Sequence, residues 1–504
     1  MGKSSEPKIF VSVGERTLQE VEQTVSNFNN SSLGLELRLD YLEDTHDLDQ
    51  SLKELINRFR FPRVLATCRR TNAGGKFAGT IEEQLEVLQK AVRAGCQIVD
   101  VELESVKSKK PQELQRLFRP ARLIVSYHNY RRSPPLDTVY RRLVRSGASI
   151  IKIATRARDL RDNLKIFRLL RSHRRRQPRL IALAMGPAGI PSRILGLQKG
   201  SHLTYASANS RGGVSPGQVA AEIMRASYRV EHLNDKTQLY GIVGSHASLS
   251  LSPIMHNAAL HAKRINAVYL PYEAQRLGDF IEVVKALGLQ GFSVTMPFKR
   301  EIFKHLDWVD PLAERIGAVN TVAVRRGKWF GWNTDAAAVT EVLSKRIRLS
   351  GSQVLVLGAG GAARAAAYAL QAEGAKVFIS ARRHSAAVRL ARAIRAQALQ
   401  WETPDWLETD SVINATPVGM PPFEHLTPTD LGRLRTRVVF DMVYHPIETR
   451  LMAEARRRGL VAISGLEMLV AQGARQFEIW TSETAPRALM EQAARQGLTH
   501  LHST

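Results

Sequence analysis

Short apolar runs alternate with amphipathic stretches along the first part of the chain. The runs are rich in β-branched residues, and the stretches between them, such as Thr80–Arg93, repeat apolar residues with a helical period. Eight apolar runs follow one another in this way: Ile9–Val13, Leu35–Leu39, Val64–Cys68, Ile98–Leu103, Leu123–Tyr127, Ile150–Ala154, Leu180–Met185 and His202–Ala206. Strands that alternate with helices in this number predict an α/β fold, a (β/α)8 TIM barrel over residues 1–230.

The sequence QVLVLGAGGAARAAAYAL at residues 353–370 has a different pattern, in which an apolar strand leads through a glycine turn into an alanine-rich helix. Gly358, Gly360 and Gly361 would let the backbone approach a pyrophosphate at the helix N-terminus. A glycine string alone is a weak signal, but the strand before it and the helix after it supply the context that a dinucleotide site requires. The pattern predicts a Rossmann domain over residues 341–464. Residues 238–340 are expected to form an α/β substrate domain, completed by residues 465–504.

Several polar residues stand near the ends of the predicted barrel strands, where a barrel of this type carries its active site. Lys152 is the most unusual, because isoleucines flank it in the run IIKIA. A lysine is costly to bury as a cation, so we expect a larger fraction of neutral amine, which can attack a ketone to form an imine. The alternative is an ammonium group that reaches solvent. His128, at the end of the preceding run, favours imine chemistry, which needs a proton-transferring group near neutral pH.

The barrel half resembles the type I 3-dehydroquinate dehydratase family over about residues 8–220. The strings that carry the resemblance are ELRLD (36–40), SYHN (126–129), IIKIA (150–154), MGPAGIPSRI (185–194), GSHLTYA (200–206) and SPGQ (215–218). The resemblance implies that Lys152 forms a Schiff base with the C3 ketone of 3-dehydroquinate and that His128 transfers protons. The residues implied to bind the hydroxyls and carboxylate of the substrate are Glu36, Arg38, Arg69, Arg193 and Gln218.

Two positions of the barrel half depart from that family's pattern. Ala73 stands where the family usually has a glutamate that orients the histidine, so another polar group would have to position His128. Val214 stands where a serine is usual, four residues before Gln218.

Hydroxyl, amide, lysine and carboxylate groups concentrate in four motifs before the glycine turn: SLSPIMHN (250–257), GFSVTMPFK (291–299), GAVNT (317–321) and GWNTD (331–335). Each motif alone is compatible with a turn or a helix cap. Together, these groups suit a polyol carboxylate as substrate. With NATPVGM (414–420), DMVYHPIETRL (441–451) and GLEMLVAQGARQFEIW (465–480), the motifs resemble shikimate dehydrogenase over about residues 238–485.

This second resemblance implies a catalytic pair, Lys299 and Asp335. Lys299 would be the acid–base group at the carbonyl or hydroxyl oxygen, held by Asp335. The residues implied to contact shikimate are Ser250, Ser252, Thr295, Asn320, Asp335, Tyr444 and Gln472. The implied cofactor-binding residues are Gly358, Ala359, Gly360, Gly361, Ala362, Arg382, Arg383, Thr416 and Gly465. Ser293 replaces a usual asparagine and Leu249 a frequent histidine, and both departures bear on substrate selectivity.

Arg382 and Arg383 follow the second predicted strand of the Rossmann domain, Val377 to Ser380. An NAD site would carry an acidic residue here for the ribose 2′-hydroxyl. Two arginines instead favour a 2′-phosphate, hence NADP, and the alternative is a solvated arginine pair.

The combined expectation is a bifunctional enzyme of the shikimate pathway. It would dehydrate 3-dehydroquinate to 3-dehydroshikimate through the lysine Schiff base and reduce 3-dehydroshikimate to shikimate with NADPH. One alternative makes the second half a quinate dehydrogenase. A nucleic-acid-binding protein is the other, since the net charge is +25. Basic runs such as Arg171–Arg176 lack interleaved aromatics for base stacking, so we expect small-molecule substrates and no nucleic acid as partner.

Composition changes this picture little. No apolar run reaches the roughly 18–20 residues of a membrane span, and Met1 to Pro7 are polar, unlike a secretory signal. Cys68 and Cys96 lie in or beside apolar runs, so we expect reduced core residues and no disulfide. These features favour a cytoplasmic protein without membrane or metal partners, and they leave a homo-oligomer open.

Overall fold

The structure is a computed structural model that describes residues 6–45, 47–107, 109–209, 213–401 and 407–502. Met1 to Ser5, the start of the polar N-terminal segment, therefore lie outside the described residues. The chain divides into two compact units. One contains residues 1–237 and 270–287, and the other contains residues 238–269 and 288–502.

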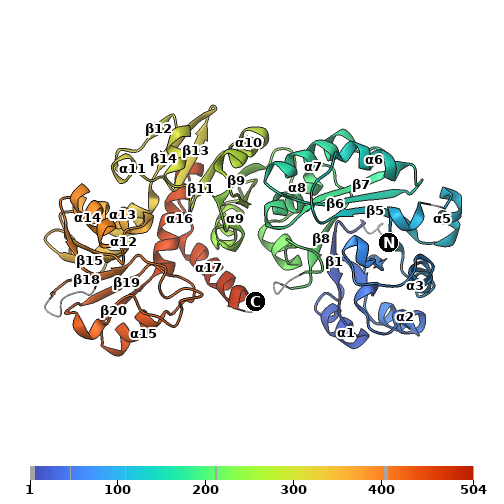
Figure 1. The fold of residues 1–504 in the computed structure, drawn as a ribbon, viewed down its shortest axis with the longest axis horizontal. Helices are drawn as coiled ribbons and strands as arrows, with labels where there is room; N and C mark the ends of the chain where they lie inside the picture. The colour runs from blue at the N-terminus through green and yellow to red at the C-terminus, as the bar shows by residue number, and fades with distance from the viewer. Residues whose placement is uncertain (1–5, 46, 108, 210–212, 402–406, 503–504) are drawn as a thin grey trace. The chain divides into compact units, whose positions relative to one another are not determined.

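The first unit is built on a parallel sheet of eight strands in the order β7-β6-β5-β4-β3-β2-β1-β8 (Figure 1). The strands are β1 (Ile9–Val13), β2 (Gly34–Arg38), β3 (Val64–Thr67), β4 (Ile98–Glu102), β5 (Arg122–Asn129), β6 (Ile150–Arg156), β7 (Arg179–Met185) and β8 (Thr204–Ser207). At the seam, the amide of His202 donates to the carbonyl of Leu180 at 2.8 Å. Every predicted apolar run overlaps one of these strands, which confirms the barrel prediction.

Helices connect consecutive strands and cover the outside of the barrel (Figure 1). They are α1 (Leu18–Ser26), α2 (Leu48–Arg58), α3 (Ile81–Arg93), α4 (Leu103–Val106), α5 (Pro111–Leu117), α6 (Leu136–Val144), α7 (Arg161–Ser172) and α8 (Ile190–Lys199). Helix α3 begins where its sequence dictates: the Thr80 hydroxyl accepts from the Glu83 amide, and the Glu83 carboxylate accepts from the Thr80 amide. The apolar residues of the strands form a buried cluster, which leaves the polar residues near the strand ends to build a site.

Two further sheets follow along the chain and belong to the second unit, except for residues 270–287, which are grouped with the first unit. The first sheet has the order β10-β9-β11-β13-β14-β12. Its strands are β9 (Gln238–Gly244), β10 (Ala267–Glu273), β11 (Gly291–Val294), β12 (Trp308–Val309), β13 (Thr321–Arg325) and β14 (Lys328–Trp332). Helices α9 (Ser252–Ala262), α10 (Leu277–Leu287), α11 (Pro311–Ile316) and α12 (Thr334–Ser344) belong to this part of the sequence. The segments that follow β9, β11 and β14, including the first turns of α9 and α12, carry the serine, lysine and aspartate motifs.

The second sheet is parallel, with the order β17-β16-β15-β18-β19-β20. Its strands are β15 (Gln353–Leu357), β16 (Lys376–Ser380), β17 (Gln397–Leu399), β18 (Ser411–Asn414), β19 (Val438–Asp441) and β20 (Val461–Ser464). Helices α13 (Gly361–Ala372), α14 (His384–Ala393) and α15 (Arg450–Arg457) alternate with them. Numbered within this sheet, the strand order is 3-2-1-4-5-6, which is the Rossmann order with its ligand crevice between the first and fourth strands. The predicted Rossmann fold is confirmed.

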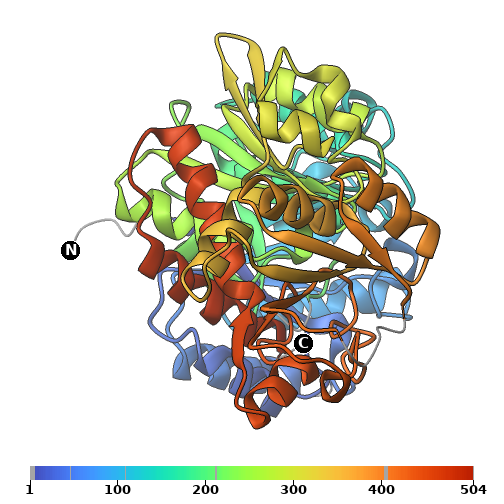
Figure 2. The ribbon, with the colours of Figure 1, turned by 90° about the vertical axis from the view of Figure 1, so that its left-hand side faces the viewer.

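Two long helices follow the last strand of this sheet. Helices α16 (Gly465–Thr481) and α17 (Arg487–His502), red in Figures 1 and 2, both contact α9 of the other sheet. Trp480 of α16 donates its indole N–H to the Val322 carbonyl at 2.9 Å, which fixes the helix to β13. The end of the chain therefore completes the fold around the first sheet.

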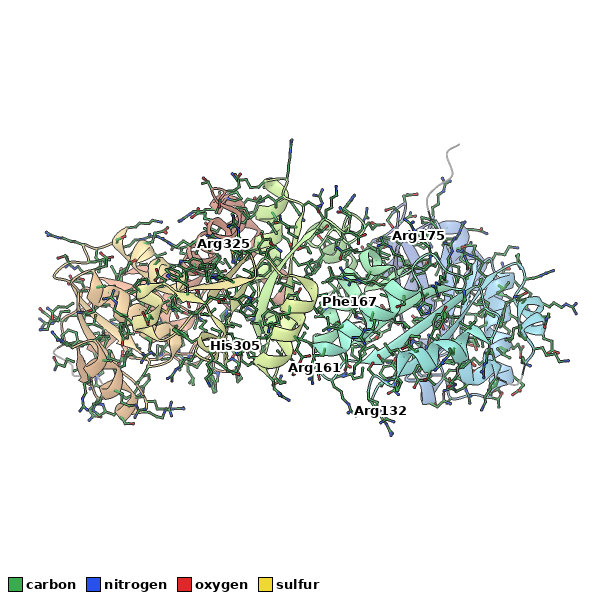
Figure 3. All side chains as sticks on the ribbon, turned by 90° about the horizontal axis from the view of Figure 1, so that it is seen from above. Arg132, Arg161, Phe167, Arg175, His305 and Arg325 are labelled. Carbon is green, nitrogen blue, oxygen red and sulfur yellow. The ribbon has the colours of Figure 1, made fainter. Side chains whose placement is uncertain are left out.

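Part of the positive charge is carried at the surface. Arg132, Arg175 and Arg325, labelled in Figure 3, are all exposed. Cys68 and Cys96 are buried free thiols, as expected. No helix in the described part of the chain has the length and apolar character needed to cross a lipid bilayer.

Candidate active sites

A pocket opens within the barrel. Each of the seven residues expected in the dehydratase site lines it: Glu36, Arg38, Arg69, His128, Lys152, Arg193 and Gln218. They come from β2, β5, β6, α8 and the segments after β3 and β8, so the barrel topology alone brings them together. Tyr130, Tyr205 and Val214 also line the pocket.

Lys152 lies deep in this pocket and is 5% exposed. Its Nζ atom is 2.9 Å from Oδ2 of Asp100 and 3.8 Å from Oε1 of Glu36. The sequence showed only the flanking isoleucines, and the structure adds these two carboxylates beside the amine. The alternative of an ammonium that reaches solvent is wrong, since the side chain stays buried among charged partners.

Asp100 is the most important residue that sequence reasoning missed. It contacts Lys152 and also Nη2 of Arg69, at 3.0 Å, and it accepts a 2.5 Å hydrogen bond from Ser126. Burial opposes ionisation of this carboxyl, but the charges of Arg69 and Lys152 outweigh burial and hold its pKa below the ordinary value. An aspartate between valines in the run IVDVE was the available signal, because such a residue needs a charged partner when buried.

His128 is adjacent to this charged group in the pocket. Burial, followed by the charges of Arg69 and Lys152, lowers its pKa well below the ordinary value, while Asp100 opposes the shift. The imidazole is therefore uncharged and able to accept a proton. Its Nδ1 atom is buried and has no hydrogen-bond partner among the described residues. Ala73 does not line the pocket, so no side chain at that position takes over the family glutamate's contact.

The cationic side chains of the pocket differ in their partners. Arg38 makes a two-point pair with Asp40, both bonds at 2.8 Å. Arg193 bonds only neutral oxygens, the Ser215 hydroxyl at 3.2 Å and the Pro216 carbonyl at 3.0 Å, and its Nε is buried without a partner among the described residues. Burial lowers the pKa of Arg193 to about 10, so it stays charged near neutral pH. A buried guanidinium in this state suits a substrate carboxylate.

Glu36 and Gln218 are joined through Ser12 of β1. The Ser12 hydroxyl donates to Oε2 of Glu36 and accepts from Nε2 of Gln218 at 3.1 Å. Thr67 donates to the other Glu36 oxygen at 2.9 Å. These bonds fix the polar wall of the pocket before a substrate arrives.

In the second unit, Lys299 and Asp335 are in direct contact, with Nζ 2.5 Å from Oδ2. Asn320 donates to the other carboxylate oxygen at 2.8 Å, and to the Thr334 hydroxyl at 3.0 Å. Asp335 stands in the first turn of α12 and Lys299 follows β11, so residues far apart in sequence meet at one point. A lysine oriented by a fixed carboxylate can transfer a proton to a substrate oxygen.

The other residues expected to contact shikimate lie around the same sheet. The Ser250 hydroxyl accepts from the Ser252 amide at 3.1 Å, where α9 begins. Thr295 follows β11, and its methyl group would lie 2.3 Å from a Cβ built on Gly244, so the ends of β9 and β11 are adjacent. Tyr444 packs with Leu251 in one apolar cluster. Gln472 lies on α16, where it donates to the Leu469 carbonyl.

The two departures from the dehydrogenase pattern lie in different surroundings. Ser293 is 4% exposed and belongs to a buried network, accepting from the Tyr269 hydroxyl at 2.7 Å and donating to Gln476 at 2.8 Å. Leu249 is 63% exposed, immediately before Ser250. Ser293 thus makes hydrogen bonds within the core, whereas Leu249 presents an apolar side chain beside Ser250 and Ser252.

The glycine turn lies in the crevice that the Rossmann strand order creates. Gly358 has a φ of +116°, and a Cβ there would lie 2.9 Å from the Ala415 carbonyl oxygen, so only glycine fits. Thr416, next to Ala415, donates to Asn414 at 2.7 Å, which orders the loop after β18. Gly360 has no atom near the Cβ position, so the backbone at the start of α13 is open to a ligand phosphate.

The remaining cofactor candidates surround this turn. Ala359 and Ala362 flank the exposed Gly360 and Gly361, and Arg382 and Arg383 are exposed after β16. A Cβ on Gly361 would lie 4.0 Å from Cδ of Lys299, which brings the turn next to the Lys299–Asp335 pair. Gly465 packs against the Met442 carbonyl. A Cβ added to Gly465 would lie only 2.4 Å from that oxygen, so the packing requires glycine here.

Comparison with known families assigns the two units separately. Residues 9–235 match the family model described as type I 3-dehydroquinase. Residues 242–322 match the shikimate dehydrogenase substrate binding domain, and residues 465–495 match the shikimate 5'-dehydrogenase C-terminal domain.

One curated relative spans most of both units. The bifunctional 3-dehydroquinate dehydratase/shikimate dehydrogenase, chloroplastic, of Arabidopsis thaliana is 36% identical over 485 residues, which cover 90% of this chain and 78% of the relative. The chain belongs to this bifunctional family.

Relatives of the dehydrogenase unit alone carry the cofactor in their names. The shikimate dehydrogenase (NADP(+)) of Thermococcus kodakarensis is 41% identical over 268 residues, which cover 52% of this chain and 98% of that protein. A crystal structure of a shikimate dehydrogenase in complex with NADP+ superposes with a TM-score of 0.51 at 36% identity, covering 53% of this chain and 97% of that one. The dehydratase activity is thus represented by one family model, and the dehydrogenase activity by two family models and by these relatives.

Proposed function

We propose that the chain catalyses two consecutive reactions, the dehydration of 3-dehydroquinate and the NADPH-dependent reduction of 3-dehydroshikimate to shikimate. The single observation that carries this proposal is the pairing of two reactive lysines with carboxylates in separate units: Lys152 with Asp100, and Lys299 with Asp335. Each pair lies among the polar groups that its reaction requires.

In the barrel, Lys152 is the nucleophile. Its amine attacks the C3 carbonyl of 3-dehydroquinate, and loss of water gives a protonated imine that acidifies the neighbouring C–H bond. Removal of that proton and departure of the hydroxyl from the next carbon release a second water and leave the imine of 3-dehydroshikimate. Hydrolysis of this imine consumes one water, frees the product and regenerates the Lys152 amine. The uncharged His128 accepts and returns protons in these steps. Arg193, which lacks an acidic partner in its described bonds, takes the substrate carboxylate.

In the second unit, Lys299 delivers the proton to the carbonyl oxygen as that oxygen gains charge, and Asp335 holds the ammonium in place. Bound NADPH supplies the hydride. Ser250, Ser252 and Thr295 bind the substrate's hydroxyls and carboxylate, together with Asn320, Tyr444 and Gln472.

The glycine turn fits a dinucleotide. Gly358 leaves free the space that a Cβ would occupy, and the open backbone at Gly360 can donate to the pyrophosphate. Arg382 and Arg383 take the 2′-phosphate, with Thr416 and Gly465 shaping the far side of the crevice. The domains follow this division: barrel 1–230, substrate domain 238–340 completed by 465–504, and NADP-binding domain 341–464. A cytoplasmic site of action suits these metabolites.

The direct test supplies the full chain with 3-dehydroquinate and NADPH and follows shikimate formation, with quinate and NADP as the comparison substrates. Borohydride added with 3-dehydroquinate should fix substrate mass on Lys152. Lys152→Ala should remove the label and the dehydratase activity but keep the dehydrogenase. Lys199→Ala, which removes another buried lysine of the barrel unit, serves as the control and should keep the label. Labelling of a different lysine would overturn the assignment, and faster turnover of quinate than of shikimate would favour a quinate dehydrogenase.

A further inference from the structure

Tyr205 of β8 lies in the barrel pocket and has no part in the chemistry described above. It is 3% exposed and lines the same pocket as Lys152 and His128. Its hydroxyl oxygen is buried and has no hydrogen-bond partner among the described residues. Because a buried hydroxyl that has lost water normally gains another partner, an unpartnered one in a ligand pocket points to a ligand.

The ring of Tyr205 makes a second and independent contact. Nζ of Lys152 lies 3.9 Å from the ring centroid, so the cation faces the ring. The face of an aromatic ring carries negative partial charge and attracts a cation. The same nitrogen is positively charged in the protonated imine, so the ring remains beside the charge while the substrate is covalently bound.

The hydroxyl is available as a donor. Burial, together with the charges of Glu36 and Asp100, raises the pKa of Tyr205 well above its ordinary value, so the proton stays on the oxygen. The substrate offers ring hydroxyls as acceptors close to the carbon that joins Lys152.

Resting on the dehydratase function proposed above, we propose that Tyr205 is a further catalytic residue with two separable roles. Its ring stabilises the positive charge on the nitrogen of Lys152, and its hydroxyl donates a hydrogen bond to a ring hydroxyl of the bound substrate. Tyr205 is also part of the apolar cluster inside the barrel. If Tyr205 were only structural, removal of its ring would lower stability, but removal of its hydroxyl would leave substrate binding unchanged.

The test separates the two roles by substitution. Tyr205→Phe removes only the hydroxyl, and it should raise the KM for 3-dehydroquinate by about ten-fold while kcat changes by less than about three-fold. Tyr205→Leu and Tyr205→Met remove the ring as well. Relative to Tyr205→Phe, each should lower kcat by about ten-fold and slow borohydride trapping on Lys152 by about ten-fold. Tyr228→Phe is the matched control, because Tyr228 is a buried tyrosine of the same unit that does not line the pocket. It should match the wild type in KM and kcat.

The outcomes distinguish this inference from the proposed function. If the wild type is labelled at Lys152 but Tyr205→Phe keeps the wild-type KM, the hydroxyl role is overturned. If both ring-free variants are trapped as fast as Tyr205→Phe, the ring role is overturned. If the wild type is not labelled at Lys152 at all, the dehydratase assignment fails, whatever the Tyr205 variants do. Tyr205→Phe is nearly isosteric, so its KM decides the hydroxyl role even where a ring-free variant does not fold, and Tyr205→Met provides a second ring-free side chain.

Discussion

Nζ of Lys152 lies 2.9 Å from Oδ2 of Asp100, although 52 residues separate the two in the sequence. Asp100 is fully buried and holds both Lys152 and Arg69. This aspartate therefore determines the charge balance of the pocket: without it, two buried cations would share Glu36 and Glu102 as their remaining carboxylates.

Asp100→Asn should damage the barrel unit in two ways. Removing one partner of a buried ion pair leaves the other uncompensated, so the free energy of unfolding should fall by about 3 kcal/mol. Dehydratase kcat should fall by at least about 10²-fold, because Lys152 loses the group that orients it. Urea unfolding and initial rates measure the two effects. Asp137→Asn, an exposed aspartate in the first turn of α6, is the control. Equal effects of both substitutions would show that Asp100 has no special role.

His256 should make the second unit sensitive to acid. It is 1% exposed and stacks on Tyr269, with centroids 4.4 Å apart. Burial lowers its pKa to about 3, against the opposing hydrogen bond with Gln476. The unfolded chain binds the proton below its ordinary pKa of about 6.5, and the folded chain does not until about pH 3. This histidine's share of stability is therefore lost as pH falls below about 6.5, at about 1.4 kcal/mol per pH unit.

Unfolding free energies measured between pH 7.5 and pH 5 test this expectation. His256→Phe should give a shallower dependence on pH than the wild type, since the group that titrates only in the unfolded state is gone. His305→Phe replaces an exposed histidine, labelled in Figure 3, and should retain the wild-type slope. Parallel curves for all three proteins would contradict the role of His256.

Substitution of Lys299 or Asp335 should lower the kcat of the dehydrogenase. Lys299→Ala or Asp335→Asn should each lower dehydrogenase kcat by about 10²–10⁴-fold, the usual cost of losing an acid–base group. NADPH binding, followed by fluorescence, should persist, because the Rossmann sheet is untouched. Lys304→Ala, an exposed lysine a short distance along the chain, should leave kcat unchanged. A loss confined to KM would instead assign the pair to substrate binding alone.

Arg382 and Arg383 should determine the choice between cofactors. A 2′-phosphate can accept charge-assisted hydrogen bonds worth roughly 1.5–3 kcal/mol each, so the wild type should prefer NADP over NAD by about one to three decades in kcat/KM. Replacing both arginines with alanine should weaken NADP far more than NAD. Steady-state kinetics with both cofactors measure the ratio. Arg392→Ala, in the last turn of α14, is a control for loss of positive charge. Equal use of both cofactors by the wild type would remove the basis for an NADP site.

The sequence predicted features that depend on local pattern. The barrel strands, the glycine turn and the pocket residues could be found because strand periodicity and short motifs are local signals. Asp100 was missed because its partner, Lys152, lies two strands away in the sheet, a pairing that no local pattern reveals. Tyr205 was overlooked for another reason: a tyrosine in an apolar run is expected to be a core residue, and only the pocket distinguishes it.

The same limit applies to the surroundings of Lys152. The sequence shows only its isoleucine neighbours, whereas the side chain meets groups from β2, β4 and β8. The positions of these groups follow from the order of the sheet.

Ser12 and Gln218 are hydrogen bonded across 206 residues of sequence, and this span constrains how the protein can be made. A chain growing on the ribosome displays Ser12 early, but the pocket wall stays incomplete until residue 218 has emerged. Contacts with such a large separation in sequence also slow folding, because a long loop must close before they form. The nascent barrel therefore exposes its half-built interior until the segment that contains Gln218 has been made.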